Sequence, residues 1–231
     1  MAAMLLLAGT AVPAAAANQG TVAVVNGIPG ERVDICVNGR ELRSRVPYGG
    51  WASRTISAGD KVLKVFRADP RTCRGTVLAK KPFTLTASPN LGSDLTLVAT
   101  KKTPKKVITF FNDSMGYIPP DGLPYIYAVW AWRHAADLGD VNFKYRLINP
   151  EQPAEPSVAG IWQKGDQFFE GSDPDEGMQL RATRPDQDAT LAKSAPVIFA
   201  ASRRYEWYLL GTTKANAKFV VFSRRVSQFV P

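Results

Sequence analysis

Short runs of alternating apolar and polar residues make up much of the chain. Val33, Ile35 and Val37 are two positions apart, which is the period of one face of a β-strand. Turn-forming pairs such as Asn38-Gly39, which favours a tight hairpin, separate these runs. In the first half we expect about seven strands, beginning near Thr21, Arg32, Ala52, Lys61, Lys81, Ser93 and Lys106. The pattern predicts an all-β chain.

The pattern occurs twice. LTLVATKK at residues 95–102 is repeated as WYLLGTTK at 207–214, and KVITFFN from Lys106 is repeated as KFVVFSR from Lys218. Both pairs are 112 positions apart, 207 against 95 and 218 against 106. Near the front, Val141, Phe143 and Tyr145 stand opposite the apolar triplet of residues 33–37. A repeat of this size indicates that one domain has been duplicated.

The duplication predicts two tandem antiparallel immunoglobulin-like β-sandwich domains. We place the first at residues 18–111 and the second at 126–231, with a short, stiff, Pro- and Gly-containing linker at 112–125. The second copy carries a proline-rich insertion at 149–156, which predicts an exposed loop. With 18 glycines and 17 prolines in 231 residues, the composition also favours short strands over long helices.

Residues 1–17 have the pattern of a secretory signal peptide. They carry no charged side chain and lead from an apolar core, Met4 to Ala8, to small residues that predict cleavage near Ala17. The pattern departs from the usual one because no Lys or Arg precedes the apolar core. No later segment has the roughly 20 apolar residues of a spanning helix. We therefore expect an exported protein, secreted or associated with the cell envelope, with no membrane span.

Export changes the interpretation of the two cysteines, Cys36 and Cys73. An oxidising compartment favours a disulfide between them, which would crosslink the first domain only. In the chain-entropy model such a loop stabilises by roughly 4 kcal/mol. The alternatives are weaker, since two cysteines and the single, distant His134 cannot complete a metal site and the pair lacks C-x-x-C spacing.

Several motifs of the first copy resemble a known family. They are GTVAVVNGIPGERVDICVNG, VPYGGWASRTISAGDKVLKVFRA and a closing LTLVAT, with the key positions at Asn26, Asp34, Asn38-Gly39, Tyr48-Gly49 and Ser57-Ala58-Gly59. In this order they resemble the secreted bacterial domain family catalogued as domain of unknown function 4397. In the second copy, Gly160-Ile161-Trp162 replaces the Tyr-Gly pair. The resemblance implies an extracellular or envelope-associated β-sandwich, commonly in tandem, with no established catalytic residues.

Charge supplies the first candidate site. The net charge is +9, and Lys101, Lys102, Lys105 and Lys106 are crowded on the predicted hairpin before the last strand of the first domain. An anionic glycopolymer that carries phosphate, sulfate or uronate groups would relieve their repulsion. The alternative is a solvated lysine-rich tip that keeps a sheet edge soluble.

Tryptophan supplies the second candidate site. An exposed indole offers an apolar face on which a sugar ring can stack, and Trp51 and Trp162 lie beside glycine-containing loops. The alternative for both is burial between sheets, which we also expect for Trp130, Trp132 and Trp207 in their strand-like runs.

Signals for catalysis are weak. His134 is the only histidine, and its place opposite Asn26 in the repeat favours a structural hydrogen bond in a turn. The acidic stretch at residues 173–177 offers oxygen ligands for calcium but lacks EF-hand spacing, so a solvated turn is the better interpretation. We therefore expect no catalytic residue, no metal, no cofactor and no nucleic-acid partner.

The sequence favours a non-catalytic interaction module of the cell envelope or the extracellular space. Its expected partner is an anionic cell-envelope polysaccharide or a surface protein. Two alternatives stay open: a secreted hydrolase of envelope polymer whose carboxylates come from distant strands, and a structural spacer.

Overall fold

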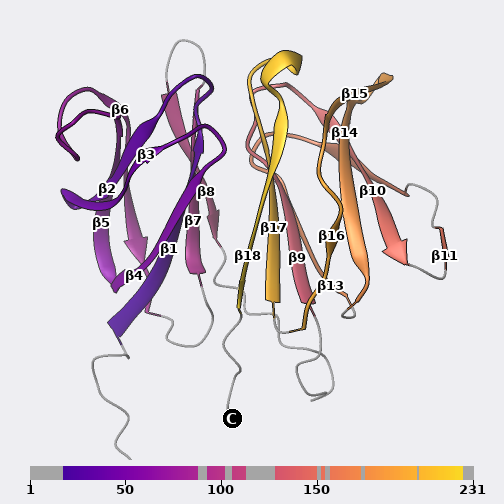
Figure 1. The fold of residues 1–231 in the computed structure, drawn as a ribbon, viewed down its shortest axis with the longest axis horizontal. Helices are drawn as coiled ribbons and strands as arrows, with labels where there is room; N and C mark the ends of the chain where they lie inside the picture. The colour runs from indigo at the N-terminus through magenta and orange to yellow at the C-terminus, as the bar shows by residue number, and fades with distance from the viewer. Residues whose placement is uncertain are drawn as a thin grey trace, which may run out of the picture.

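The computed structural model of the chain is all-β (Figure 1). It describes residues 18–87, 93–101, 106–112, 128–149, 152–153, 157–172, 175–201 and 203–225. The predicted signal peptide, residues 1–17, and the predicted linker beyond residue 112 lie outside the described residues. No helix within the described ranges is both long enough and apolar enough to cross a membrane.

Eight strands form two four-stranded sheets in the first half. They are β1 (Gln19–Gly27), β2 (Val33–Val37), β3 (Arg40–Val46), β4 (Trp51–Ser57), β5 (Gly59–Arg67), β6 (Val77–Leu85), β7 (Ser93–Lys101) and β8 (Lys106–Asn112). One sheet has the order β4-β1-β7-β8, and the other has the order β3-β2-β5-β6.

The second half repeats this strand order. Its strands are β9 (Ala128–His134), β10 (Val141–Asn149), β11 (Gln152–Pro153), β12 (Ser157–Trp162), β13 (Gln167–Ser172), β14 (Gly177–Arg184), β15 (Gln187–Lys193), β16 (Val197–Ile198), β17 (Arg203–Leu210) and β18 (Lys218–Arg225), with a 3-10 turn, η3, at Lys214–Asn216. One sheet is β13-β9-β17-β18, and the other is β11-β10-β14-β15, with β12 on β10 and β16 on β14. Each strand of the first half has a counterpart here.

The pairing differs from the antiparallel expectation once in each half. β1 pairs with β7, and β9 pairs with β17, in parallel. All the other described pairs are antiparallel. Parallel strands are usually covered on both faces of their sheet, whereas antiparallel strands often have one face in water. Both of these pairs lie in the two sheets at the middle of the molecule, where they are covered on both sides.

Each half has its own apolar core. Val33, Ile35 and Val37 face the first core together, as their two-residue spacing predicts. Val141 and Phe143 are buried in the second core, and Tyr145 packs against it. The second core is the more aromatic of the two, since Trp132 and Trp207 are both fully buried there.

Strand β3 is absent from the strands expected from the sequence. The Asn38-Gly39 pair does form the expected hairpin turn, with φ of 49° and 75°, and Arg40 pairs with Val37 across it. β3 itself reads RELRSRV and is mostly exposed, because it is the edge strand of its sheet. An edge strand rich in arginine has no apolar alternation from which to predict it.

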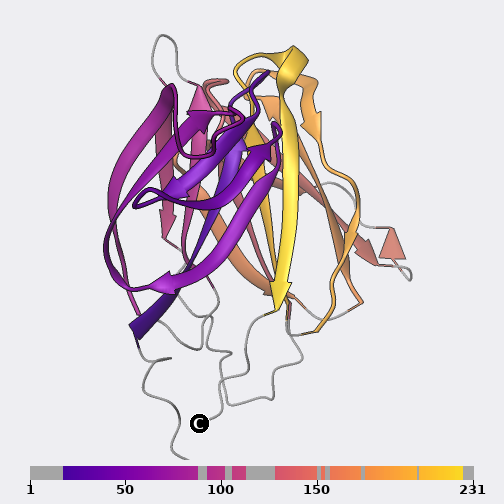
Figure 2. The same ribbon diagram turned by 60° about the vertical axis from the view of Figure 1, so that its left-hand side comes forward.

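A third apolar cluster joins the two halves. Ala23 and Val25 of β1 pack with Tyr208 and Leu210 of β17, on the faces turned away from the two cores. Figures 1 and 2 show the sheets that carry β1 and β17 side by side at the centre of the molecule. Consecutive residues of these strands are therefore buried on both faces: all six residues from Val22 to Gly27 are buried, and so are seven of the eight residues of β17.

The disulfide prediction is confirmed: Cys36 and Cys73 are bonded, with their Cα atoms 5.8 Å apart. Cys36 points away from the first core, on the outer face of β2. The bond fixes the loop between β5 and β6 over that face. Asp34, also on the outer side, accepts hydrogen bonds from the backbone of Arg45 and Asp69, so the same loop buries it.

Candidate binding cleft

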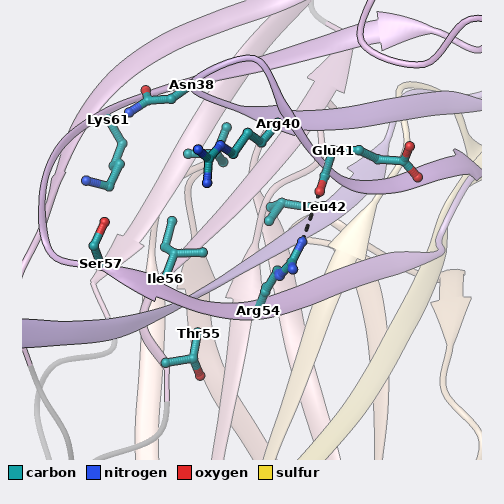
Figure 3. A pocket seen from close by; sticks show the side chains of 10 residues that line it. Asn38, Arg40, Glu41, Leu42, Arg54, Thr55, Ile56, Ser57 and Lys61 are labelled. Carbon is teal, nitrogen blue, oxygen red and sulfur yellow. Dashed lines mark hydrogen bonds between the residues drawn. The ribbon is translucent and has the colours of Figure 1, made fainter. Parts of the chain in front are cut away.

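An open cleft of about 560 Å³ lies at one edge of the first half, where the edge strands β3 and β4 of different sheets approach each other (Figure 3). We call it the open-edge cleft. Its lining residues are Val37, Asn38, Arg40, Glu41, Leu42, Arg54, Thr55, Ile56, Ser57 and Lys61. A cleft of this size is large enough for a short oligosaccharide or a similar small ligand.

Two reciprocal hydrogen bonds run between the edges of the cleft. Arg43 of β3 donates from Nη1 to the carbonyl oxygen of Trp51 in β4, at 2.9 Å. Arg54 of β4 donates from Nη1 to the carbonyl oxygen of Glu41 in β3, at 3.3 Å. Since both acceptors are neutral carbonyls, the two hydrogen bonds position the guanidinium groups without neutralising their charge.

Positive charge gathers in the cleft. Arg40, Arg54 and Lys61 line it, and none of them forms an ion pair with a described carboxylate. The Nζ of Lys61 donates to the carbonyl oxygen of Ala58 at 3.0 Å, which again leaves the charge in place. Glu41 is the one acidic residue of the lining, and its carboxylate points away from the two arginines (Figure 3). The cleft therefore attracts anions.

Hydroxyl and amide groups lie beside the cations. The Oδ1 of Asn38 accepts a hydrogen bond from the backbone N–H of Val62 at 2.7 Å, which turns the amide N–H groups toward solvent. Ser57 also lines the cleft, whereas the side chain of Thr55 projects from β4 on the side opposite Ile56 (Figure 3), where its hydroxyl bonds that of Thr21 at 2.9 Å. Leu42 and Ile56 pack against the first core and give the cleft an apolar floor.

The two described lysines of the predicted hairpin, Lys101 and Lys106, lie on other strands than those of the cleft. Lys101 and Lys106 face each other across the last rung of the β7–β8 pair, and Lys102 and Lys105 lie outside the described residues. The register places Thr100 beside Gly27 at one end of β1, whereas Ser57 lies beside Gln19 at the other end. Arg54, the cleft residue of β4 nearest to the Gly27 end, lies beside Val22, so about five residues of β1 at about 3.3 Å each separate it from the end next to Thr100.

Trp51 lies in the contact between the two halves. Its ring stacks on Phe222 with the centroids 4.9 Å apart, so the partner of one indole face is a side chain of the second half. The neighbouring Tyr48 donates from its hydroxyl to the carbonyl oxygen of Asn216 at 2.7 Å. Lys218 donates to the carbonyl oxygen of Tyr48 and lies 4.4 Å from the centre of its ring. The Tyr-Gly motif therefore joins the two halves.

Trp162 packs on the edge of the second core. Its ring centroid lies 5.8 Å from that of Phe143, 6.0 Å from Phe168 and 6.2 Å from Trp132. Most of the Trp162 side chain is therefore buried, which is the alternative to sugar stacking. Core burial is confirmed for Trp132 and Trp207. The side chain of Trp130 lies outside the described residues.

His134 has the structural role that the repeat predicts. Its Nε2 bonds the carbonyl oxygen of Gly139 at 2.9 Å, and it pairs with Leu209 as Asn26 pairs with Ala99. Asn26 likewise uses its side chain to bond the loop that follows its own strand. Burial, more than any charged neighbour, lowers the pKa of His134 below its ordinary value.

The acidic stretch of the second half does not gather metal ligands in its described part. Asp175 and Glu176 form backbone hydrogen bonds with Phe199, and Asp173 lies outside the described residues. Within the ranges that the structure describes, no three His, Cys, Asp or Glu side chains lie close enough to hold a metal ion.

Arg40, Arg54 and Lys61 are site residues that sequence reasoning missed. Arg40 belongs to the run Arg40, Arg43 and Arg45, which is a signal of a charged strand, but Arg54 and Lys61 stand alone in the sequence. The three cations meet because β3 and β4 are edges of two different sheets. A sequence pattern gives the face of a strand but not the identity of the edge that lies opposite it.

No family model matches the chain, and no curated protein is similar to it. The similar solved structures include three with low scores. The TIE protein of Bacillus anthracis is 11% identical with a TM-score of 0.25, and the match covers 87% of this chain but only 34% of that one. A family 26 carbohydrate-binding module of Eubacterium rectale Amy13K, in complex with maltoheptaose, is 9% identical with a TM-score of 0.24, over 91% of this chain and 98% of that one. A candidate cell adhesion protein of Parabacteroides distasonis is 11% identical with a TM-score of 0.24, over 93% and 99%. At these scores the similarities do not establish a common fold.

Proposed function

We propose that the chain is an exported, non-catalytic interaction module that binds an anionic glycan in the open-edge cleft. One observation supports this proposal above the others: three cations without described carboxylate partners meet over an apolar floor in a cleft of about 560 Å³. The cations suit carboxylate, sulfate or phosphate groups, and Asn38 and Ser57 suit sugar hydroxyls.

The proposal includes the finer architecture and the location of the protein. The two halves are taken as tandem immunoglobulin-like sandwiches of the secreted domain family that the first copy resembles. The repeated strand order supports the duplication. The disulfide supports an oxidising compartment, where an anionic envelope polymer would meet the cleft.

The hydrolase alternative lacks support in this cleft. Glycoside hydrolysis uses two carboxyl groups on either side of the bond that breaks. The described lining supplies one, Glu41, which points away from the cations (Figure 3). The residues of the cleft therefore favour a binding function over hydrolysis.

The experiment is an equilibrium binding assay of the purified mature chain with polygalacturonate and hyaluronan, and with neutral dextran, over a range of salt concentrations. We expect both anionic polymers to bind, binding to weaken with salt, and dextran not to bind. The test variant is Arg40→Ala/Arg54→Ala/Lys61→Ala. The control variant Arg71→Ala/Arg74→Ala/Lys80→Ala loses the same charge at exposed positions outside the cleft.

Loss of binding in the cleft variant alone supports the proposal. Equal losses in both variants would mean that net charge, and not the cleft, attracts the polymer. The variant Lys101→Ala/Lys102→Ala/Lys105→Ala/Lys106→Ala tests the other candidate site. If this variant alone loses binding, the glycan site is the lysine hairpin and the cleft assignment is wrong.

A further inference from the structure

A second hollow lies next to the open-edge cleft, at Lys61 of β5. It has a volume of about 410 Å³ and is lined by Asp60, Lys61, Val62, Pro82, Phe83 and Thr84. Lys61 lines both hollows, so the two are neighbours on either side of this lysine. A linear ligand that extends past Lys61 contacts both hollows.

The chemistry of the second hollow is opposite to that of the cleft. Besides the shared Lys61, the second hollow has one charged group, the carboxylate of Asp60. Its Oδ1 accepts a hydrogen bond from the hydroxyl of Thr84 at 2.7 Å. The register places Thr84 directly opposite Asp60 on β6. Pro82 and Val62 are opposite each other two positions further along the pair and provide apolar surface.

A carboxylate with a fixed hydroxyl beside apolar carbon suits a neutral sugar. Its oxygens accept hydrogen bonds from sugar hydroxyl or amide groups, and the apolar surface accepts the C–H face of the ring. A second anionic unit would instead be repelled by Asp60. The cleft selects a negative unit because Arg40 and Arg54 line it, and the second hollow selects against one.

We infer that the ligand is a linear glycan in which an anionic unit is joined directly to a neutral unit. The anionic unit lies in the open-edge cleft, the neutral unit lies against Asp60 and Thr84, and Lys61 lies between them. This inference rests on the proposed function, because it specifies the ligand of the same cleft. It excludes a uniformly anionic chain as the best ligand.

The test compares two decasaccharides by calorimetric titration: a hyaluronan fragment, which alternates anionic and neutral units, and a polygalacturonate fragment, in which every unit is anionic. For the wild type we expect the alternating fragment to bind about tenfold more tightly. Asp60→Asn removes the charge but keeps the size of the side chain. It should weaken binding of the alternating fragment about fivefold and strengthen binding of the uniform fragment about threefold.

The control is Asp186→Asn, which removes an exposed carboxylate in the turn between β14 and β15 of the second half and should change neither affinity. Equal wild-type affinities for the two fragments, or Asp60→Asn shifts of the same sign for both, would overturn the inference. The proposed function would still stand if the cleft variant lost binding of both fragments. If neither fragment binds the wild type at all, the proposed function fails and the inference fails with it.

Discussion

The two ends of strand β4 have opposite surroundings. At its first residue, Trp51 stacks on Phe222 of the second half, beside a tyrosine and a lysine that also bond across to it. From Arg54 to Ser57 the same strand lines an open cleft with unneutralised cations. The comparison shows that the aromatic residue and the charged residue of one short strand have different roles. The aromatic end holds the molecule together, and the cationic end is left available to a ligand.

The largest effect is expected at the closed end. Phe222→Ala removes a ring that is 4% exposed and stacks on both Trp51 and Tyr208. Truncating a buried phenylalanine should lower the free energy of unfolding by about 3 kcal/mol. Chemical denaturation followed by tryptophan fluorescence measures this change. An unfolding free energy within about 0.5 kcal/mol of the wild type would show that the halves do not depend on this contact.

A pH effect of intermediate size is expected at His134. Its folded-state pKa lies below 6.5 because burial disfavours the charged imidazole. The unfolded chain therefore binds more protons just below pH 6.5. Stability is complete above that pH and falls as the pH drops from about 6.5 toward the folded pKa, by at most about 1.4 kcal/mol per pH unit.

His134→Asn tests this expectation, because Asn26 occupies the equivalent position in the first half. The variant should fold and should lose this part of the pH dependence. Denaturation curves between pH 7.5 and 5 measure both proteins. An unchanged slope in the variant would place the titrating group elsewhere in the chain.

The smallest effect on stability is expected at the open end. Removing Arg40, Arg54 and Lys61 deletes hydrogen bonds to backbone carbonyls but no ion pair among the described residues, and it relieves mutual repulsion. We expect the triple alanine variant to keep its unfolding free energy within about 0.5 kcal/mol. Thermal melting followed by circular dichroism tests this. A large loss would mean that the cations hold β3 to β4 and would give the cleft a structural role.

Strand faces and the disulfide followed from the sequence, because two-residue spacing and a lone cysteine pair depend on local chemistry. The repeat also followed from the sequence, but the exact alignment of the two halves did not. His134 pairs with Leu209 as Asn26 pairs with Ala99, so the halves align 110 positions apart in this strand, 209 against 99, and not 112. A shift of two residues keeps every side chain on its face, so an alternating pattern cannot detect it.

The cleft was beyond the reach of sequence reasoning for a related reason. Its cations come from three strands, and β3 was itself missed because a charged edge strand has no apolar alternation. Trp51 was recognised as a residue of interest, but its partner, Phe222, lies in the other half of the chain. Packing between the halves decides which exposed-looking residues are covered, and no local pattern contains that information.

The most direct test of the central claim is to map the ligand contact residue by residue. The isotope-labelled mature chain is titrated with the hyaluronan decasaccharide, and the backbone amide signals are followed by nuclear magnetic resonance. We predict the largest shifts in residues 37–42, 54–57 and 60–62, with little change near Trp51 or Lys101. Shifts confined to residues 101–106, or to the contact between the halves, would contradict the assignment of glycan binding to the open-edge cleft.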